Sequence, residues 1–188
     1  MSSPSVPAWW RLYCEHREEW EDGDLEEVIA DLERRPPNRQ LLSPIVASFL
    51  AGLVQGGGEV GYLVMRAGAG EVVHVPYVLF RCDRETAVFV LRQVGDAFTE
   101  EGRGFYQLYV TGLRAVILLR IVEPYLRGVK RWVGALAARY GYKLSGGRLG
   151  ILLGEKGLAF RRCYRVVGGR RIATIVPRDL ADRVDPQP

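Results

Sequence analysis

The sequence has few of the residues that most often serve catalysis, metal binding and disulfide formation. Only two of its 188 residues are histidines and three are cysteines. The cysteines, at positions 14, 82 and 163, are widely spaced, odd in number and free of any CxxC pair, so they indicate neither a disulfide framework nor a zinc site. We expect reduced thiols. His16 and His74 are far apart in sequence, and we expect each to pack or cap locally, which argues against histidine-based catalysis.

The chain also lacks a long uninterrupted apolar run. The longest, residues 41–54, is broken by Ser43, Pro44 and Ser48 and is too short to cross a bilayer. The N-terminus MSSPSVPAWW has no basic region followed by an apolar one, as a secretory signal would. With 48% hydrophobic and 26% charged residues, the composition predicts a folded globular protein, cytoplasmic and without a membrane partner.

Basic charge is carried almost entirely by arginine, since only three of the 26 basic residues are lysines. Residues 1–40 hold ten acids against five arginines, a net charge of −5, so the remaining residues carry +9. The acidic segment predicts a helical leader that packs on the body or shields its basic surface. Arginine forks onto phosphates, so the basic body is compatible with a nucleic-acid partner, although a GC-rich genome would favour arginine as well.

Local patterns predict an α+β body over residues 41–143. Ser43 followed by Pro44 indicates a capped helix start. The order of elements is helix, hairpin, helix, strand, helix, helix, which predicts helices stacked on one face of an antiparallel sheet. The predicted helices span residues 44–56, 84–98, 113–122 and 126–140, and the predicted strands span residues 59–66, 72–81 and 105–111.

The first of these helices ends in LAGLVQGGG, residues 50–58. Glycine inside a helix costs roughly 1 kcal/mol relative to alanine, so Gly52 calls for a packing reason. Gly52 and Gly56 are spaced as GxxxG, which lets two helix backbones approach closely. We expect Gly57 and Gly58 to adopt backbone angles that other residues avoid. The predicted helix-helix face consists of slender side chains: Ser48, Ala51, Gly52, Gln55 and Gly56.

LAGLVQGGG resembles the signature helix of the LAGLIDADG homing endonucleases, and EPYLRGVKRW at residues 123–132 is similar to that family's PYL-x-x-K-[KR] segment. Together with the intervening order of elements, the resemblance covers residues 41–143. A single copy of the signature resembles the members that act as homodimers, whose signature helices pack together at a two-fold axis. The resemblance therefore implies a DNA-binding homodimer.

The chain departs from this family at the residues that would bind a metal. In the family the eighth position of the signature is an acid that holds a divalent cation; here it is Gly57, and the sixth position is Gln55. A hard cation such as Mg²⁺ needs anionic oxygen ligands, so we expect no catalytic residue and no cofactor. Glu59 is the nearest acid. It lies about 6.6 Å further along by strand rise, and it is the ligand only under the alternative of an Mg²⁺-dependent endonuclease.

The two strands of the predicted hairpin are apolar on both sides, which differs from a DNA-reading surface. Strands of this kind are normally covered on both faces. The sequence offers three occupants for the second face: the acidic leader, the C-terminal extension, or a partner protein.

The extension, residues 144–188, predicts a tight hairpin around Gly168-Gly169. Its arginines could lie along phosphates, or they could simply keep an exposed edge hairpin soluble. The nucleic-acid-binding candidates are Arg81, Arg161, Arg162, Arg165, Arg170 and Arg171.

The sequence thus favours a nucleic-acid-binding homodimer, with duplex DNA as partner, that derives from a homing endonuclease and lacks nuclease activity. One alternative is a working metal-dependent, site-specific DNA endonuclease. Another is an RNA maturase-like protein that binds structured RNA, or a protein-interaction scaffold.

Overall fold

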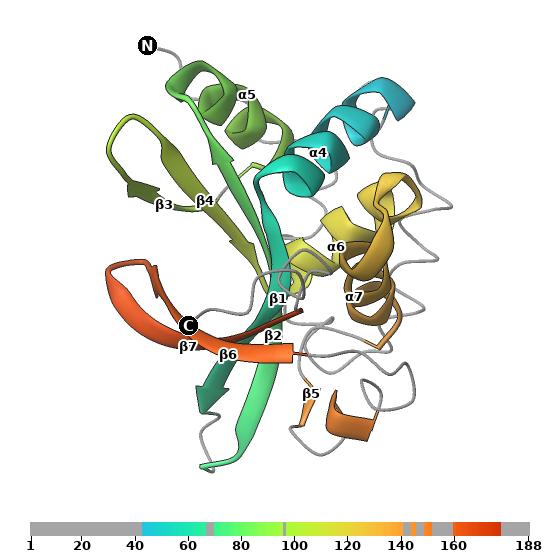
Figure 1. The fold of residues 1–188 in the computed structure, drawn as a ribbon, viewed down its shortest axis with the longest axis vertical. Coiled ribbons are helices and arrows are strands. Elements are labelled where there is room, and N and C mark those ends of the chain that lie inside the picture. The colour runs from blue at the N-terminus through green and yellow to red at the C-terminus, as the bar shows by residue number, and fades with distance from the viewer. Residues whose placement is uncertain are drawn as a thin grey trace, which may run out of the picture.

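The structure, a computed structural model, describes residues 43–66, 70–95, 97–140, 144–145, 149–151 and 160–177. It has an α+β fold in which helices cover one face of a curled antiparallel sheet, as the sequence predicts (Figure 1). The acidic leader predicted over residues 1–40 lies outside the described residues. No helix in the described part of the chain is both long enough and apolar enough to span a bilayer.

The sheet has seven strands in the order β3-β4-β2-β1-β7-β6, with the short β5 also paired to β2. Every ladder is antiparallel, and the longest register in the body pairs Glu59 with Leu79 and Arg66 with Val72. The strands are β1 (Glu59–Arg66), β2 (Val72–Cys82), β3 (Phe98–Glu101), β4 (Tyr106–Thr111), β5 (Leu144–Ser145), β6 (Phe160–Val167) and β7 (Arg170–Pro177).

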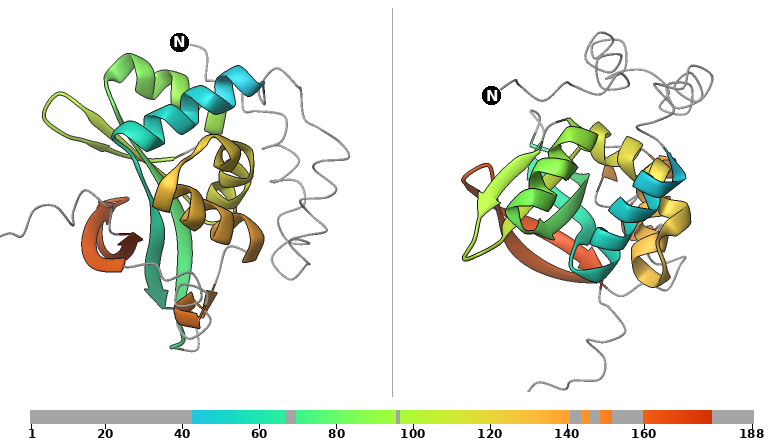
Figure 2. Two further views of the ribbon diagram at one scale, coloured as in Figure 1. Left: turned by 45° about the vertical axis from the view of Figure 1, so that its right-hand side comes forward. Right: turned by 90° about the horizontal axis from the view of Figure 1, so that it is seen from above.

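The helices form a layer against one face of the sheet, and the main core lies between the two (Figures 1 and 2). Helix α6 is the most deeply buried, because seven of its residues, from Leu113 to Val122, are shielded from solvent. The helices are α4 (Pro44–Gly56), α5 (Arg84–Val94), α6 (Leu113–Val122) and α7 (Gly128–Tyr140), with a 3-10 turn, η1 (Glu123–Tyr125), between the last two.

Helix α4 begins and ends where the sequence predicts. The Ser43 side chain accepts a hydrogen bond from the Val46 N–H at 3.2 Å, and Pro44 occupies the first turn. The expectation of unusual backbone angles at Gly57 and Gly58 is wrong, since neither has a positive φ. Gly58 is required for space instead: a Cβ there would overlap the Leu79 carbonyl oxygen and lie 2.7 Å from the Val54 Cα.

The helix predicted over residues 84–98 is shorter in the structure. The helix expected over residues 84–98 ends at Val94, because Gly95 takes a φ of 86° and turns the chain out of the helix. Phe98 then begins β3, a strand that the sequence analysis missed.

The second face of the sheet is covered by the C-terminal hairpin. β7 pairs with β1, and the sheet then curls so that β1 and β2 lie between the helices and the β6–β7 hairpin (Figure 2). At the tip of the hairpin, the Gly169 N–H donates to the Glu100 carboxylate at 3.1 Å, and Gly168 faces the Phe98 ring. This curl encloses a second core of Leu63, Tyr77, Leu79, Tyr109, Val167 and Val176.

Candidate nucleic-acid interface

The two segments that carry the family resemblance meet at the carboxyl end of α4. Lys130 of α7 is 9% exposed, and its Nζ donates to the carbonyls of Val54 at 3.0 Å, Gln55 at 3.1 Å and Gly58 at 3.0 Å. The Arg127 N–H donates to the Gln55 Oε1 at 3.0 Å. A cation at this end of a helix satisfies carbonyls that have no partner within the helix. This role is not predicted by the sequence patterns, although Lys130 is the only lysine of the second segment.

Glu59 lies inside the curled sheet in an ion pair with Arg165. The Glu59 Oε2 is 2.7 Å from the Arg165 Nη2, and its Oε1 accepts from the Arg165 Nε at 3.2 Å and from the Tyr77 hydroxyl. The Glu59 side chain is 12% exposed and that of Arg165 is 20% exposed. The two side chains come from positions 106 residues apart, brought together by the pairing of β7 with β1.

The electrostatics of this pair favour charge on both partners. Burial raises the pKa of Glu59, but the hydrogen bonds from Arg165 and Tyr77 and the charges of Arg165 and Arg81 outweigh it, so its pKa is lowered from the ordinary 4.5. The hydrogen bond to Glu59 raises the pKa of Arg165. Burial, followed by the negative charge of Glu59, raises the pKa of Tyr77. The carboxylate is therefore ionised and held in place.

This geometry does not fit a divalent cation. Both oxygens of Glu59 already accept hydrogen bonds, and Gly57 has no side chain that could supply a ligand. Within the described ranges, no cluster of three or more His, Cys, Asp or Glu side chains could hold a metal ion. Glu59 serves as the partner of Arg165 in this arrangement, and Arg165, predicted to contact nucleic acid, faces inward.

Of the three occupants predicted for the second face of the sheet, the structure places the C-terminal extension on it. Gly61 shows how closely the hairpin approaches: a Cβ there would lie 2.6 Å from the Ile175 carbonyl oxygen and 3.0 Å from the Tyr77 ring. The part of this face between β4 and β7 is thus occupied by the chain itself.

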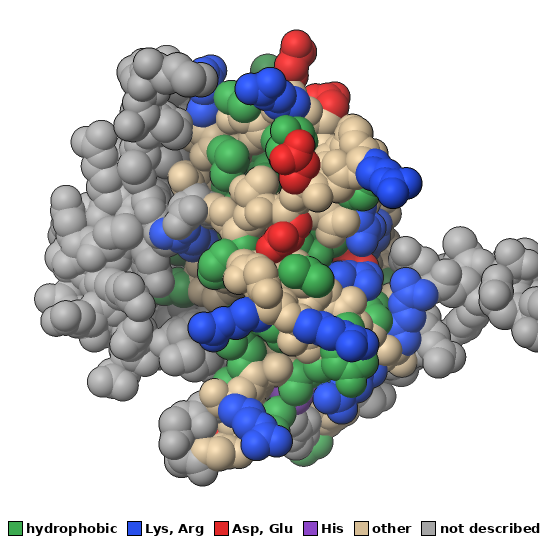
Figure 3. Space-filling model, turned by 90° about the vertical axis from the view of Figure 1, so that its left-hand side faces the viewer, with side chains coloured by type: hydrophobic (Ala, Val, Ile, Leu, Met, Phe, Trp, Pro, Cys, Tyr) green, Lys and Arg blue, Asp and Glu red, His purple; other side chains and the backbone are tan. Residues whose placement is uncertain are grey.

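The other candidate arginines remain on the surface. Arg161, Arg162, Arg170 and Arg171 are exposed on the β6–β7 hairpin. On the side of the molecule where β3, β4 and the β6–β7 turn lie, Asp and Glu side chains lie mostly over the upper half, interspersed with Lys and Arg, whereas the lower half carries Lys and Arg (Figure 3). Arg81 is exposed too, but its Nη1 donates to the Gly57 carbonyl at 3.2 Å. Arg81 therefore lies near the end of α4, where its charge also acts on Glu59.

The predicted helix-helix face of α4 is exposed except at one position. Ser48, Gly52, Gln55 and Gly56 are exposed, whereas Ala51 is 1% exposed and belongs to the core of its own chain. The prediction is wrong for Ala51, because its side of α4 packs against the core of its own chain.

Two large apolar side chains share the exposed face of α4. Ile45 is 80% exposed and Phe49 46%, and the Phe49 ring packs edge-on against Phe89 with a centroid distance of 5.3 Å. No atom of the described residues lies within 4 Å of a Cβ built on Gly52 or Gly56. Packing within the described part of the chain therefore gives no reason for glycine at either position.

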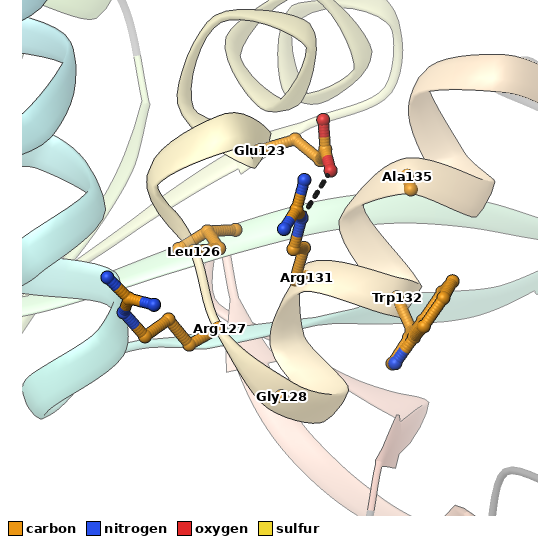
Figure 4. Close-up of a pocket in the computed structure, with 7 residues that line it drawn as sticks. All are labelled: Glu123, Leu126, Arg127, Gly128, Arg131, Trp132 and Ala135. Atoms are coloured by element: carbon orange, nitrogen blue, oxygen red, sulfur yellow. Dashed lines mark hydrogen bonds and ion pairs between the residues drawn. The ribbon is translucent and has the colours of Figure 1, made fainter.

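A cavity of about 420 Å³ lies where η1 meets the start of α7. Arg131 donates to the Glu123 carboxylate at 2.9 Å, whereas Arg127 points toward α4 and Trp132 points the other way (Figure 4). A small-molecule site needs polar groups that converge on one point. This arrangement does not supply them. The lining residues are Glu123, Leu126, Arg127, Gly128, Arg131, Trp132 and Ala135.

Comparison with solved structures finds the homing endonuclease I-CvuI in complex with its target Sro1.3 in the presence of Ca, at 17% sequence identity and a TM-score of 0.41, over 53% of this chain and 66% of that one. A second I-CvuI structure, in complex with the I-CreI target C1221 in the presence of Mg and with the DNA not cleaved, matches at the same identity and TM-score over 49% and 62%. The chain thus covers less than two thirds of either endonuclease chain. No protein-family model and no curated protein matches it.

Proposed function

We propose that this protein binds duplex DNA as a homodimer, that it derives from a LAGLIDADG homing endonuclease, and that it does not cleave the DNA. The observation that carries the proposal is that the Glu59 carboxylate is fully engaged by hydrogen bonds within the chain. It is the nearest acid to the end of the signature-like helix, and Arg165 and Tyr77 occupy both of its oxygens. A metal-dependent nuclease would need that carboxylate free, together with further anionic ligands.

The proposed DNA-binding surface is the outside of the β6–β7 hairpin, because the hairpin itself fills the inner face of the curled sheet. Arginine is suited to phosphate contacts, since its planar guanidinium donates two parallel hydrogen bonds. Arg162 and Arg171 are exposed on the outward side of the hairpin, Arg170 is exposed beside the turn, opposite the inward-facing Val167, and none of the three forms an ion pair with a described residue. Three exposed guanidinium groups on one two-stranded ribbon, one of them stacked on the Tyr164 ring, would follow a phosphate backbone without reading its sequence.

The proposed dimer contact is the exposed face of α4. Gly52 and Gly56 lower helix stability without a close neighbour among the described residues, and Ile45 and Phe49 expose apolar surface beside them. A second copy of α4 packed across a two-fold axis would use the open space above Gly52 and Gly56 and would cover both apolar side chains. At the edge of this face, the Gln55 side chain accepts a hydrogen bond from the Arg127 N–H.

The test of DNA binding is the salt dependence of affinity for a random duplex. Each phosphate contact that is lost should reduce the slope of log affinity against log salt by about 0.9. We expect replacement of Arg162, Arg170 and Arg171 by glutamine to flatten the slope by two to three such steps. The control replaces Arg84, Arg92 and Arg103, three exposed arginines outside the hairpin, and removes the same charge. Equal slopes for the two triple variants would remove the hairpin from the interface.

The test of the missing nuclease activity is incubation with a plasmid library in Mg²⁺ or Mn²⁺. We expect no cleavage. Cleavage by the wild type that is lost in a folded Glu59→Gln variant would overturn the proposal and establish the endonuclease alternative. Preference for structured RNA over duplex DNA in competition would favour the maturase-like alternative.

A further inference from the structure

The outer face of the β6–β7 hairpin carries more than charge. Side chains alternate along β6, so Cys163, Arg165 and Val167 face the interior of the curled sheet while Tyr164 and Val166 face outward. Tyr164 is 53% exposed and Val166 is 50% exposed. The two lie about 6.6 Å apart along the strand and form an apolar strip on an otherwise basic surface.

Tyr164 is paired with an arginine from the neighbouring strand. The Arg171 Cζ lies 4.4 Å from the centre of the Tyr164 ring, a cation-π contact. The register places Arg171 opposite Val166, and Arg162 two residues before Tyr164 on the same outward side. An aromatic ring and a guanidinium plane are thus held together on the surface, flanked by a second exposed arginine.

A charged edge that only prevents aggregation does not need this pattern. Edge strands are protected by charge and by interruption of apolar surface, whereas here a half-exposed tyrosine and valine alternate with inward residues to make a continuous strip. Arginine interleaved with an aromatic ring on an exposed strand is the arrangement that binds single-stranded nucleic acid. Every base has a π-face that can stack on such a ring or guanidinium plane, and the flanking cations neutralise phosphates.

We infer that the outer face of the β6–β7 hairpin binds an unpaired nucleic-acid strand, with one base stacked on the Tyr164–Arg171 pair, Val166 beside the next base, and Arg162 on a phosphate. This inference rests on the proposed function, because it uses the same hairpin, and it adds a preference. The base faces of a duplex are stacked inside the helix, so the Tyr164–Arg171 pair contributes to binding only where bases are unpaired.

The experiment compares full-length variants by fluorescence anisotropy on a labelled single-stranded 20-mer of thymidine and on a random duplex of the same length. We expect Tyr164→Ala to lower single-strand affinity by roughly 5- to 150-fold, the range for loss of one stacked base, and to leave duplex affinity and both salt slopes unchanged. Tyr164→Phe should keep single-strand affinity, because the ring remains.

Arg171→Lys separates stacking from charge. Lysine keeps the positive charge and loses the planar guanidinium. We therefore expect it to lower single-strand affinity at an unchanged salt slope, whereas Arg162→Lys should change neither. Tyr125→Ala, which removes a tyrosine that is 41% exposed on η1, is the matched control and should leave both affinities unchanged.

The outcomes distinguish the two proposals. If Tyr164→Ala lowers affinity equally for both ligands, or for neither, the stacking site is overturned. The proposed function stands in that case as long as the wild type binds duplex DNA. Wild-type protein that binds neither ligand would overturn both. Circular dichroism melting of each variant confirms that any loss comes from a folded protein.

Discussion

Replacement of Glu59 by glutamine should destabilise the protein with no nucleic acid or metal present. The Glu59 carboxylate accepts two charge-assisted hydrogen bonds from Arg165 and a third from Tyr77. Removing one partner of a buried ion pair costs about 3–5 kcal/mol. Because the two side chains are still 12% and 20% exposed, and glutamine keeps an acceptor for Tyr77, we expect the lower end, about 3 kcal/mol.

The assay is urea unfolding at neutral pH, with the loss read from the midpoint at an unchanged slope. Glu71→Gln, at an exposed acid on the other end of the β1–β2 hairpin, is the control and should change stability by less than about 0.5 kcal/mol. A double-mutant cycle with Arg165→Met should show a coupling energy above about 1 kcal/mol. Additive effects, or a loss below about 1 kcal/mol for Glu59→Gln, would refute the structural role assigned to this pair.

The same pair predicts a pH dependence. The folded-state pKa of Glu59 is lowered, so its contribution is fully present above the ordinary value of 4.5 and is lost as the pH falls through the folded-state value. The wild type should therefore lose more stability than Glu59→Gln when the pH is lowered below 4.5. Parallel curves for the two proteins would contradict this.

Four further variants test other contacts. Gly58→Ala should lower the free energy of unfolding in urea by about 1–3 kcal/mol, because its Cβ would overlap the β2 backbone. Gly57→Ala, where the structure shows open space, should be nearly neutral. Equal effects of the two variants would refute the close approach of Gly58 to β2. Lys130→Met keeps the aliphatic stem but removes three hydrogen bonds to carbonyls at the end of α4, so the free energy of unfolding should fall by about 3 kcal/mol. A fall of less than about 1 kcal/mol would contradict the role of Lys130 in satisfying these carbonyls. Gly52→Leu should convert the proposed dimer to a folded monomer in light scattering, and a wild type that is already monomeric would rule the dimer out.

Local signals predicted most of the helices and strands. Ser43 and Pro44 place the start of α4 correctly, and Gly168-Gly169 marks the turn of the C-terminal hairpin, because caps and tight turns depend on residues a few positions apart. Local spacing does not predict the end of α5. Phe98 continues the apolar helical spacing, but Gly95 adopts a positive φ and the chain enters a strand.

The candidate site was predictable only in part. A count of arginines identifies the C-terminal hairpin but cannot tell that Arg165 faces inward while Arg162 faces outward, since a shift of one residue in strand register exchanges the two. The role of Lys130 could not be predicted from the sequence either, because it depends on long-range contacts. Its acceptors are backbone carbonyls more than 70 residues away, which carry no sequence signal of their own.

The sequence by itself determined the α+β composition, the ends of α4, the basic hairpin and the lack of an acid at residue 57, because each depends on residue identity or on neighbours within a few positions. Only the tertiary structure decided that the hairpin fills the second face of the sheet and that Glu59 binds Arg165. Those contacts join segments about a hundred residues apart, and they exist only once β7 has paired with β1 and the sheet has curled.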